Sequence, residues 1–470
     1  MSRQFLVVLL LFLSSFAQTN LASNRIDDAR MKQYADLAQQ WEIEYLQIDT
    51  TNPPGNEMRA VAFFKKILDA EGIENQAIKF DAARNRGNLW AVIPGSGKKR
   101  PLILLNHMDV VSSDPQRWTH PPFSAAIDDG YIYGRGAQDM KSEGLAHLMT
   151  MVMLKREKVQ LDRDVIFLAV ADEEADDTGA DWMIGRQRDL LRNAEYLINE
   201  GGYNLVENGK VKYVGVDVAE KTTYWMRVTA HGKPGHGSQP LPDSAPNRLV
   251  AALTKLIAYQ TPLKLTPTVE EWLKVMASFE KPDRAEVYRN IRKYLNDPKF
   301  IASLPKDDLN PKLRNTIQLT MLGGSQQTNV IPGEAWAQLD VRMLPGEDPE
   351  KLRAELVRVV NDPNVTITPV NKVFRKANFS PTNTELYEVF RKASAAYFGN
   401  APVAPYLTGG YTENQRFREI GIESYGFSPY AVLEEVSDTE HGDNERIAVV
   451  EVRRGFRVMY DVVNEVAGAK

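Results

Sequence analysis

Three short apolar segments, each followed at once by histidine or acidic side chains, constrain the fold of this chain more than any other feature. They are residues 102–106, 165–170 and 196–199. Apolar runs of this length are typical of buried strands. Helical periodicity occurs at residues 26–48, in a second segment that ends near Gly72, and at 145–155. Strands that alternate with helices predict an α/β fold with a mostly parallel sheet, whose functional residues lie at the strand ends.

The pattern changes after Lys221. Strands with alternating apolar and polar residues are predicted at 224–230, 317–321, 335–343 and 364–369, with a helix at 348–360. Such alternation indicates a sheet with one exposed face, and the earlier pattern resumes from 383 onward. We therefore predict one α/β domain made of 23–221 and 379–470, interrupted by an inserted α+β domain at 222–378. The charged, proline-containing stretch 266–315 would shape either a pocket or an interface.

The first 22 residues are predicted to be a signal peptide. Arg3 precedes an apolar stretch at 5–17, in which Ser15 and Ala17 offer a small-x-small cleavage site. The stretch is shorter than a membrane-spanning helix needs, so an uncleaved anchor is the less favoured alternative. We expect an exported protein, periplasmic or secreted, without membrane attachment after cleavage.

Composition narrows the chemistry that the chain can carry out. There is no cysteine, so disulfides, thiolate zinc sites and a cysteine nucleophile are excluded. Any metal must be bound by carboxylates and by some of the six histidines. The net charge is −5, with both signs mixed along the chain and no long basic run, which argues against nucleic acid as a partner.

Acidic residues and histidines follow the predicted strands and recur late in the chain. The candidates are His107 with Asp109, Asp139, Glu173 with Glu174, Glu200, and His441. Each has an ordinary alternative, such as a structural histidine, a helix cap or a solvated acidic turn. Together they form a set of nitrogen and oxygen ligands that suits zinc, with manganese or cobalt as alternatives. One of the two adjacent glutamates would bind metal while the other acts as general base, and Asp109 would accept a hydrogen bond from the second ring nitrogen of His107.

Motifs along nearly the whole mature chain resemble those of a known family. In order they are TNPPGNE, NHMDVV, WTHPPF, GRGAQDMK, DEE, NEGG, GHGSQP, GGSQQTNVIP, LDVRMLP, GFSP and HGDNE. The chain is similar to the aminoacylase and glutamate-carboxypeptidase family of di-zinc hydrolases, which includes succinyl-diaminopimelate desuccinylase. The resemblance implies a zinc-exopeptidase-like catalytic domain and a ferredoxin-like inserted domain that serves as lid and dimerisation domain.

The resemblance also implies roles for single residues. Five of them would bind two zinc ions: His107 with Glu200 on one ion, Glu174 with His441 on the other, and Asp139 as the bridge. Glu173 would be the general base, and Asp109 would support His107.

Further contacts are implied in and near the inserted domain. His236 is similar to the family histidine that stabilises the tetrahedral oxyanion, often across a dimer interface. Asn329, Arg342 and Gly410 would contact the substrate. Arg342 suits a carboxylate because a planar guanidinium can bind one in a bidentate manner. The sequence leaves open whether there is a homodimer, and whether His236 acts in its own chain or across such an interface.

These residues predict a secreted metal-dependent exopeptidase, of carboxypeptidase or dipeptidase type, that cleaves an amide bond beside a free carboxylate. A close alternative is an N-acyl-amino-acid amidohydrolase, or aminoacylase, so the substrate is a small peptide or an N-acyl amino acid. A more distant alternative is a non-catalytic binding protein on the same fold, and the presence of the base and all five ligands argues against it. The chain departs from aminoacylases at Glu413 and Gln415, where they have aspartate and arginine, and this leaves the identity of the substrate open.

Overall fold

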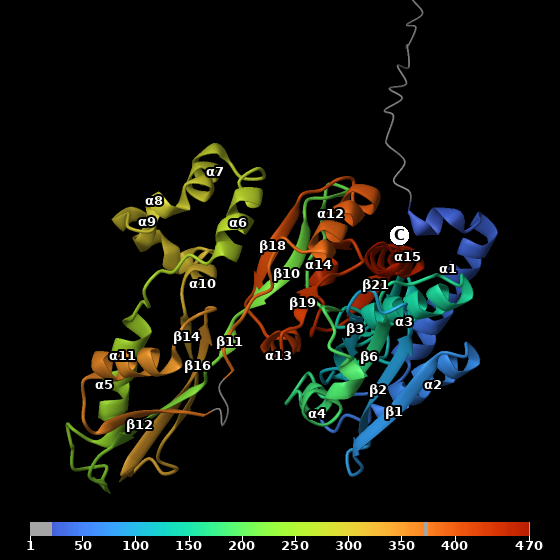
Figure 1. Cartoon of the computed structure of the whole chain (residues 1–470). Helices are drawn as coiled ribbons and strands as arrows, with labels where there is room; N and C mark the ends of the chain where they lie inside the picture. Colours follow the sequence, from blue (N-terminus) through green and yellow to red (C-terminus); the bar gives the residue numbers. More distant parts are fainter. Residues whose placement is uncertain (1–20, 371–374, 470) are drawn as a thin grey trace, which may run out of the picture.

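An eight-stranded sheet forms the centre of the larger domain (Figure 1). The computed structural model describes residues 21–370 and 375–469. In spatial order the strands are β1 (Glu74–Asp81), β2 (Arg86–Ile93), β6 (Val165–Val170), β3 (Leu102–His107), β7 (Tyr196–Asn199), β19 (Glu423–Gly426), β10 (Val214–Glu220) and β18 (Val403–Thr408). Strands β6, β3, β7 and β19 are parallel, whereas β1, β2 and β10 join through antiparallel pairings. The α/β prediction is confirmed, with a parallel centre inside a mixed sheet.

The parallel centre determines where the functional side chains lie. Strands β3, β6 and β7 are buried along their whole length because both faces of the sheet are covered. Parallel strands have their carboxyl ends at the same edge of a sheet. The residues that follow these three strands therefore meet at one edge.

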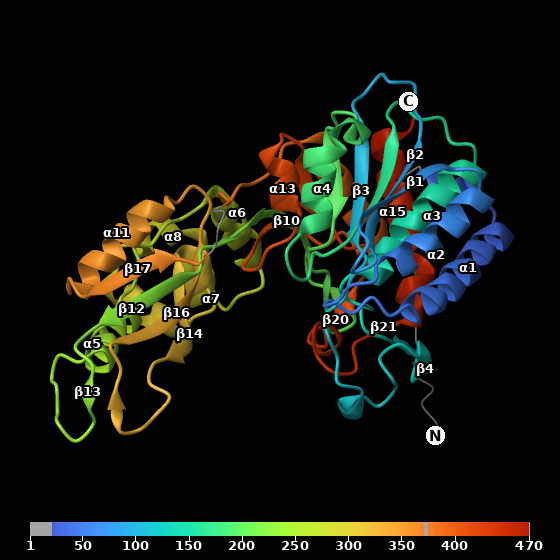
Figure 2. The ribbon, with the colours of Figure 1, turned by 90° about the horizontal axis from the view of Figure 1, so that it is seen from below.

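Helices cover both faces of this sheet (Figure 2). On one face lie α1 (Asp28–Leu46), α2 (Met58–Ala70), α3 (Lys141–Arg156), α12 (Glu385–Tyr397) and α15 (Val449–Ala467), which share one hydrophobic core. On the other lie α4 (Thr178–Arg186), the 3-10 turn η3 (Arg188–Leu191) and α13 (Asn414–Glu419). Helix α3 is buried from Lys141 to Leu154 because it packs against the sheet, α1 and α15.

A second, antiparallel sheet forms the inserted α+β domain. It contains β11 (Thr222–Thr223), β12 (Met226–His231), β14 (Thr316–Gly323), β16 (Glu334–Met343) and β17 (Val365–Pro369). Helices α5 (Ala245–Ala258) and α11 (Pro349–Val360) pack on one face and share a separate core with it. Buried and half-exposed residues alternate along β16 because the other face is uncovered. A two-stranded antiparallel sheet projects from this domain, made of β13 (Gly235–His236) and β15 (Val330–Ile331).

The charged stretch 266–315 folds into short helices. They are α6 (Pro267–Met276), α7 (Pro282–Arg289), α8 (Ile291–Tyr294), α9 (Pro298–Ser303), the 3-10 turn η4 (Leu304–Lys306) and α10 (Asn310–Leu313). Several of the prolines occupy first turns, where no backbone N–H is needed. Trp272 and Leu273 of α6 belong to the core of the larger domain and pack near β18. The stretch thus packs against the sheet of the larger domain, although in sequence it lies between β12 and β14 of the inserted domain.

Short elements complete the chain. Two three-stranded sheets are formed by β4 (Ala126–Asp128), β5 (Tyr131–Tyr133) and β21 (Arg446–Ala448), and by β8 (Leu205–Glu207), β9 (Lys210–Val211) and β20 (Val432–Leu433). The remaining elements are the 3-10 turns η1 (Ala22–Arg25) and η2 (Pro115–Arg117) and the short helix α14 (Glu434–Ser437). Within the described residues no helix has the length and apolarity needed to cross a membrane. The predicted signal peptide lies almost entirely outside them.

Candidate metal centre and active site

Five of the predicted residues meet at the edge where the parallel strands end. His107 is the last residue of β3, Glu174 follows β6, and Glu200 follows β7. Asp139 lies in the turn before α3, and the peptide bond that follows it is cis. His441 comes from the loop after α14.

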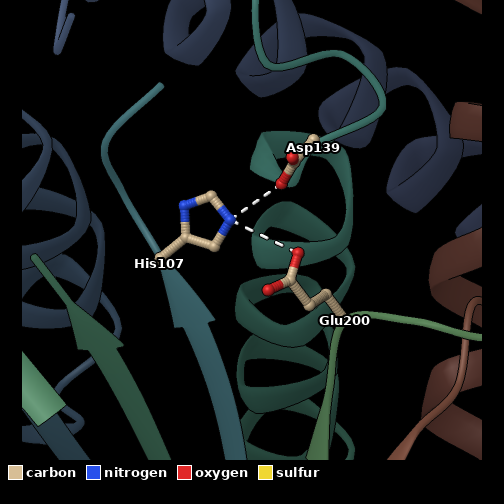
Figure 3. Close-up of side chains that lie close together, drawn as sticks. All are labelled: His107, Asp139 and Glu200. Carbon is tan, nitrogen blue, oxygen red and sulfur yellow. Dashed lines mark hydrogen bonds and ion pairs between the residues drawn. The ribbon is translucent and has the colours of Figure 1, made fainter. Parts of the chain in front are cut away.

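His107 contacts two carboxylates, as Figure 3 shows. Its Nε2 atom lies 2.8 Å from Oδ1 of Asp139 and 3.4 Å from Oε2 of Glu200. The imidazole is fully buried. Burial lowers the pKa of His107, but Glu200 and Asp139 outweigh it and leave that pKa well above its usual value.

A second cluster shares Asp139. Nε2 of His441 lies 2.8 Å from Oδ2 of Asp139 and 3.3 Å from Oε2 of Glu174. Hydrogen bonds to Asp139 and Glu174 raise the pKa of His441 to about 11. In each cluster the three ligand atoms lie within 4.8 Å of one another. The two oxygens of Asp139 therefore face two different sites, each able to hold one cation.

Glu173 lies beside this pair of clusters rather than within either. Its carboxylate is within 4.8 Å of those of Glu200 and Glu413, so three carboxyl groups converge there. Burial and the neighbouring Glu200 raise the pKa of Glu173 well above its usual value. Burial likewise raises the pKa of Glu413 to about 8. These buried carboxyl groups can be ionised together only if cations lie close by.

Asp109 lies next to His107, but it differs from the prediction in the atom that contacts the imidazole. Nδ1 of His107 is 3.0 Å from the backbone oxygen of Asp109 and 3.7 Å from the nearer carboxylate oxygen. The carboxylate instead accepts hydrogen bonds from the backbone N–H groups of Glu173 and Glu174, both at 3.1 Å, and from Asn52 at 2.8 Å. Asp109 thus orients His107 with its backbone and holds the glutamate loop with its side chain.

Glu445 is a buried residue of the site that the sequence did not single out. Its carboxylate accepts hydrogen bonds from the backbone N–H groups of Gly136, Gln138 and Asp139, at 3.0, 2.7 and 3.2 Å. It also pairs with Arg135 at 2.5 Å, and Arg135 donates to the backbone oxygen of Gly442. Glu445 and Arg135 therefore fasten the loop of Asp139 to the loop of His441. Both lie inside motifs noted above, GRGAQDMK and HGDNE, which was the only signal in the sequence.

The remaining candidates in the inserted domain do not reach the clusters within one chain. His236 is exposed on β13 of the two-stranded sheet, where its Nδ1 accepts a hydrogen bond from the backbone N–H of Ser238. Asn329 lies beside it, and its backbone oxygen accepts from Gly237 at 2.8 Å. Figure 2 shows β13 at the end of the inserted domain that points away from the larger sheet. Arg342 lies on β16, where it pairs with Asp340 at 2.9 Å.

A cavity of about 350 Å³ opens beside the clusters. Asp139, Glu173, Glu174, Glu200 and His441 all contribute to its wall. Gly410, predicted to contact the substrate, lines the same cavity. The clustered ligands therefore face a space large enough for a small ligand.

Comparisons with known proteins agree with this geometry. The model of Peptidase family M20/M25/M40 matches residues 103–465. Aminoacylase-1 of Mus musculus is 27% identical over 412 residues, covering 86% of this chain and 89% of that protein. Probable carboxypeptidase S-like 2 of Dictyostelium discoideum is 26% identical, covering 91% and 81%. The fold is similar to the crystal structure of human carnosine dipeptidase 1, with a TM-score of 0.67 and 17% identity over 93% of this chain and 98% of that one. The chain belongs to the M20/M25/M40 peptidase family and is a metal-dependent hydrolase.

Proposed function

We propose that this protein is an exported exopeptidase, of carboxypeptidase or dipeptidase type, that uses two zinc ions to hydrolyse an amide bond beside a free carboxylate. The observation that carries the proposal is the position of Asp139. One of its oxygens contacts His107 and the other contacts His441, each at 2.8 Å. A carboxylate held in this way is suited to bridge two cations.

The donor set fits zinc. Each cluster offers one imidazole nitrogen and two carboxylate oxygens, a combination that zinc accepts. Oε1 of Glu174 is buried and has no hydrogen-bond partner among the described residues. His107 and Glu200 would hold one ion and Glu174 and His441 the other, with Asp139 shared. Manganese or cobalt would be accepted by the same donors.

The chain's own residues supply the proton transfer. When bound, the two cations would acidify a water molecule and polarise the scissile carbonyl. Glu173 lies close enough to the ligands to take the proton of the attacking water and to return it to the leaving nitrogen. Its raised pKa suits this role, because a general base works best when its pKa is near the working pH. Asp109 keeps Glu173 in place through the backbone N–H of that residue.

Residues of the inserted domain would bind the substrate from a second copy of the chain. His236 and Asn329 are exposed at the two-stranded sheet of β13 and β15. Arg342 lies on the uncovered face of the five-stranded sheet. The outer strand β14 exposes Met321 and Leu322 by 50% and 64%, which suits burial in a homodimer. In such a dimer His236 would stabilise the oxyanion, and Arg342 would bind the substrate carboxylate.

An aminoacylase activity is the second candidate, favoured by the 27% identity to mouse Aminoacylase-1. Metal content and turnover should be measured together on enzyme reconstituted with zinc. The substrates are dipeptides, longer peptides, N-acetyl amino acids and long-acyl amino acids. Release of amino acids from the peptides supports the exopeptidase. Activity confined to acyl amino acids would replace it with the aminoacylase, and metal binding without turnover on any substrate would favour a binding protein.

Export is a separate part of the proposal. It is supported by the apolar stretch at 5–17 behind Arg3. Expression of the full chain in a bacterium, followed by mass spectrometry of the periplasmic and external fractions, tests it. A mature N-terminus near residue 18 or 23 is expected, whereas an uncleaved chain in the cytosolic fraction would rule the proposal out.

A further inference from the structure

The cavity beside the metal ligands extends to a wall that the proposed hydrolysis does not use. Besides small, aliphatic and neutral polar residues, this wall carries several tyrosine and carboxyl side chains, among them Tyr203, Tyr406, Asp217 and Glu440. Among the described residues that line the cavity, there is no lysine or arginine. The rings of Tyr203 and Tyr406 meet edge to face with their centroids 5.9 Å apart. Aromatic faces and carboxyl groups together attract cations.

Asp217 is the most constrained residue of this wall. It lies on β10, and only 1% of it is exposed. Its Oδ2 accepts a hydrogen bond from the hydroxyl of Thr408, while its Oδ1 has no partner in the part of the chain that the structure describes. A Cβ atom on Gly201 would come within 2.6 Å of Oδ2, so the glycine leaves room for the carboxyl group. Because Gly201 directly follows Glu200, Asp217 lies close to the metal ligands.

The cations of the protein near Asp217 are engaged elsewhere. Lys312 donates to the hydroxyl of Tyr406 at 3.2 Å, and Arg418 pairs with Glu220 at 3.2 Å. A buried carboxyl oxygen without a donor costs free energy, and a ligand that supplies the donor recovers it. Burial raises the pKa of Asp217 to about 7, and the hydrogen bond from Thr408 and the charges of Arg418 and Lys312 offset only part of this effect.

We propose that this cavity binds a protonated amine on the acyl side of the scissile amide, and that Asp217 is the residue that recognises it. The inference rests on the proposed function, because the ligands beside the cavity fix where the scissile carbonyl lies. Two sources share this chemistry: the free α-amine of a dipeptide and a basic side chain. Either group extends from the carbon next to the scissile carbonyl, and the cavity begins at the ligands that would hold that carbonyl.

Matched substrate pairs test the proposal on the zinc-reconstituted wild-type enzyme. The first pair is Ala-Leu and N-acetyl-Ala-Leu, and the second is N-acetyl-Lys-Leu and N-acetyl-norleucyl-Leu. We expect kcat/KM to be at least about tenfold higher for the amine-bearing member of one pair, since a charged hydrogen bond is worth that much. A preference in the first pair identifies the α-amine, and one in the second identifies the side chain. Hydrolysis without preference in either pair overturns the proposal, and this needs no variant.

Variants then assign the preference to one residue. Asp217→Asn should bring kcat/KM of the two members of the preferred pair together, with the larger loss on the amine-bearing member. Asp128→Asn, with a side chain that is 59% exposed, is the matched control and should keep the preference. Equal loss on both members would show that Asp217 is only structural, and would overturn its assignment.

Binding separates this inference from the proposed function. If no amide is hydrolysed, the proposed function fails, and calorimetry with two matched pairs still decides the cavity: alanine amide with N-acetyl-alanine amide, and N-acetyl-lysine amide with N-acetyl-norleucine amide. Tighter binding of the amine-bearing member of one pair to wild type, lost in Asp217→Asn, supports the amine site. Equal binding within both pairs overturns it.

Discussion

Replacing Glu445 by alanine should weaken the site although it replaces no proposed metal ligand. The change leaves the guanidinium of Arg135, which is 2% exposed, without its carboxylate partner. Three backbone N–H groups in the turn that carries Asp139 lose their acceptor as well. Breaking a buried ion pair by removing one partner costs about 3–5 kcal/mol. Because the turn then no longer fixes Asp139, zinc affinity should fall by about 10–100-fold.

Urea unfolding of the metal-free protein, followed by tryptophan fluorescence, measures the loss of stability. Competition with a chelator measures the loss of zinc affinity. Glu445→Gln should lose less, since its amide oxygen keeps part of the acceptor function. Glu388→Ala, with a side chain that is 61% exposed, is the control and should change stability by less than about 0.5 kcal/mol. An unchanged urea midpoint together with unchanged zinc affinity in Glu445→Ala would refute the idea that this carboxylate holds the two loops together.

Four further outcomes are expected. Glu173→Gln should keep its zinc but lose about 10²–10⁴-fold in kcat, measured by metal analysis and turnover; a rate near wild type would remove Glu173 as the base. Mixing inactive Glu173→Gln with inactive His236→Ala should restore part of the activity if His236 acts across a dimer, because one site of each mixed dimer is then intact; no recovery despite proven subunit exchange would place it within its own chain. The metal-free protein should lose stability as pH falls from 6.5 towards 3, because burial lowers the pKa of His147 to about 3 and the unfolded chain takes up the proton first. His147→Gln should flatten this dependence, and an acid unfolding profile of the variant that matched wild type would contradict the explanation. Zinc affinity should also weaken as pH falls, since the ions displace protons from His441, whose pKa is raised to about 11 without metal; zinc titrations between pH 8 and 6 that gave one constant would exclude that competition.

Three of the five predicted ligands, His107, Glu174 and Glu200, come at or soon after the ends of buried strands, and this pattern singled them out in the sequence. His107 ends β3 and Glu200 follows β7, so an apolar run followed by a histidine or an acidic residue is a signal that the sequence alone carries. Glu445 has no such local signal, because it acts on backbone N–H groups more than 300 positions earlier in the chain. Asp109 was found, but sequence spacing does not tell a backbone oxygen from a carboxylate at similar distances from Nδ1.

The sequence likewise predicts those parts of the fold that leave a local pattern of apolar and polar residues. Periodicity gives the elements of the inserted domain, such as β16 and α11, since one face of each is exposed. It does not give partners that are distant in sequence. The packing of α6 near β18 depends on Trp272 and Leu273 fitting a core formed elsewhere in the chain, and the high charge of the surrounding stretch conceals those two residues.

The place of β19 in the sheet has a consequence for biosynthesis. This strand, Glu423–Gly426, lies between β7 and β10 and is the only link on the strand path between the two parts of the described sheet. A nascent chain that has not yet emerged beyond Gly426 therefore leaves β7 with an unpaired backbone edge, the kind of edge at which chains pair with one another and aggregate. The eight-stranded sheet therefore cannot be completed before residue 426 has been made, and we expect fragments that end before Glu423 to expose this edge of β7.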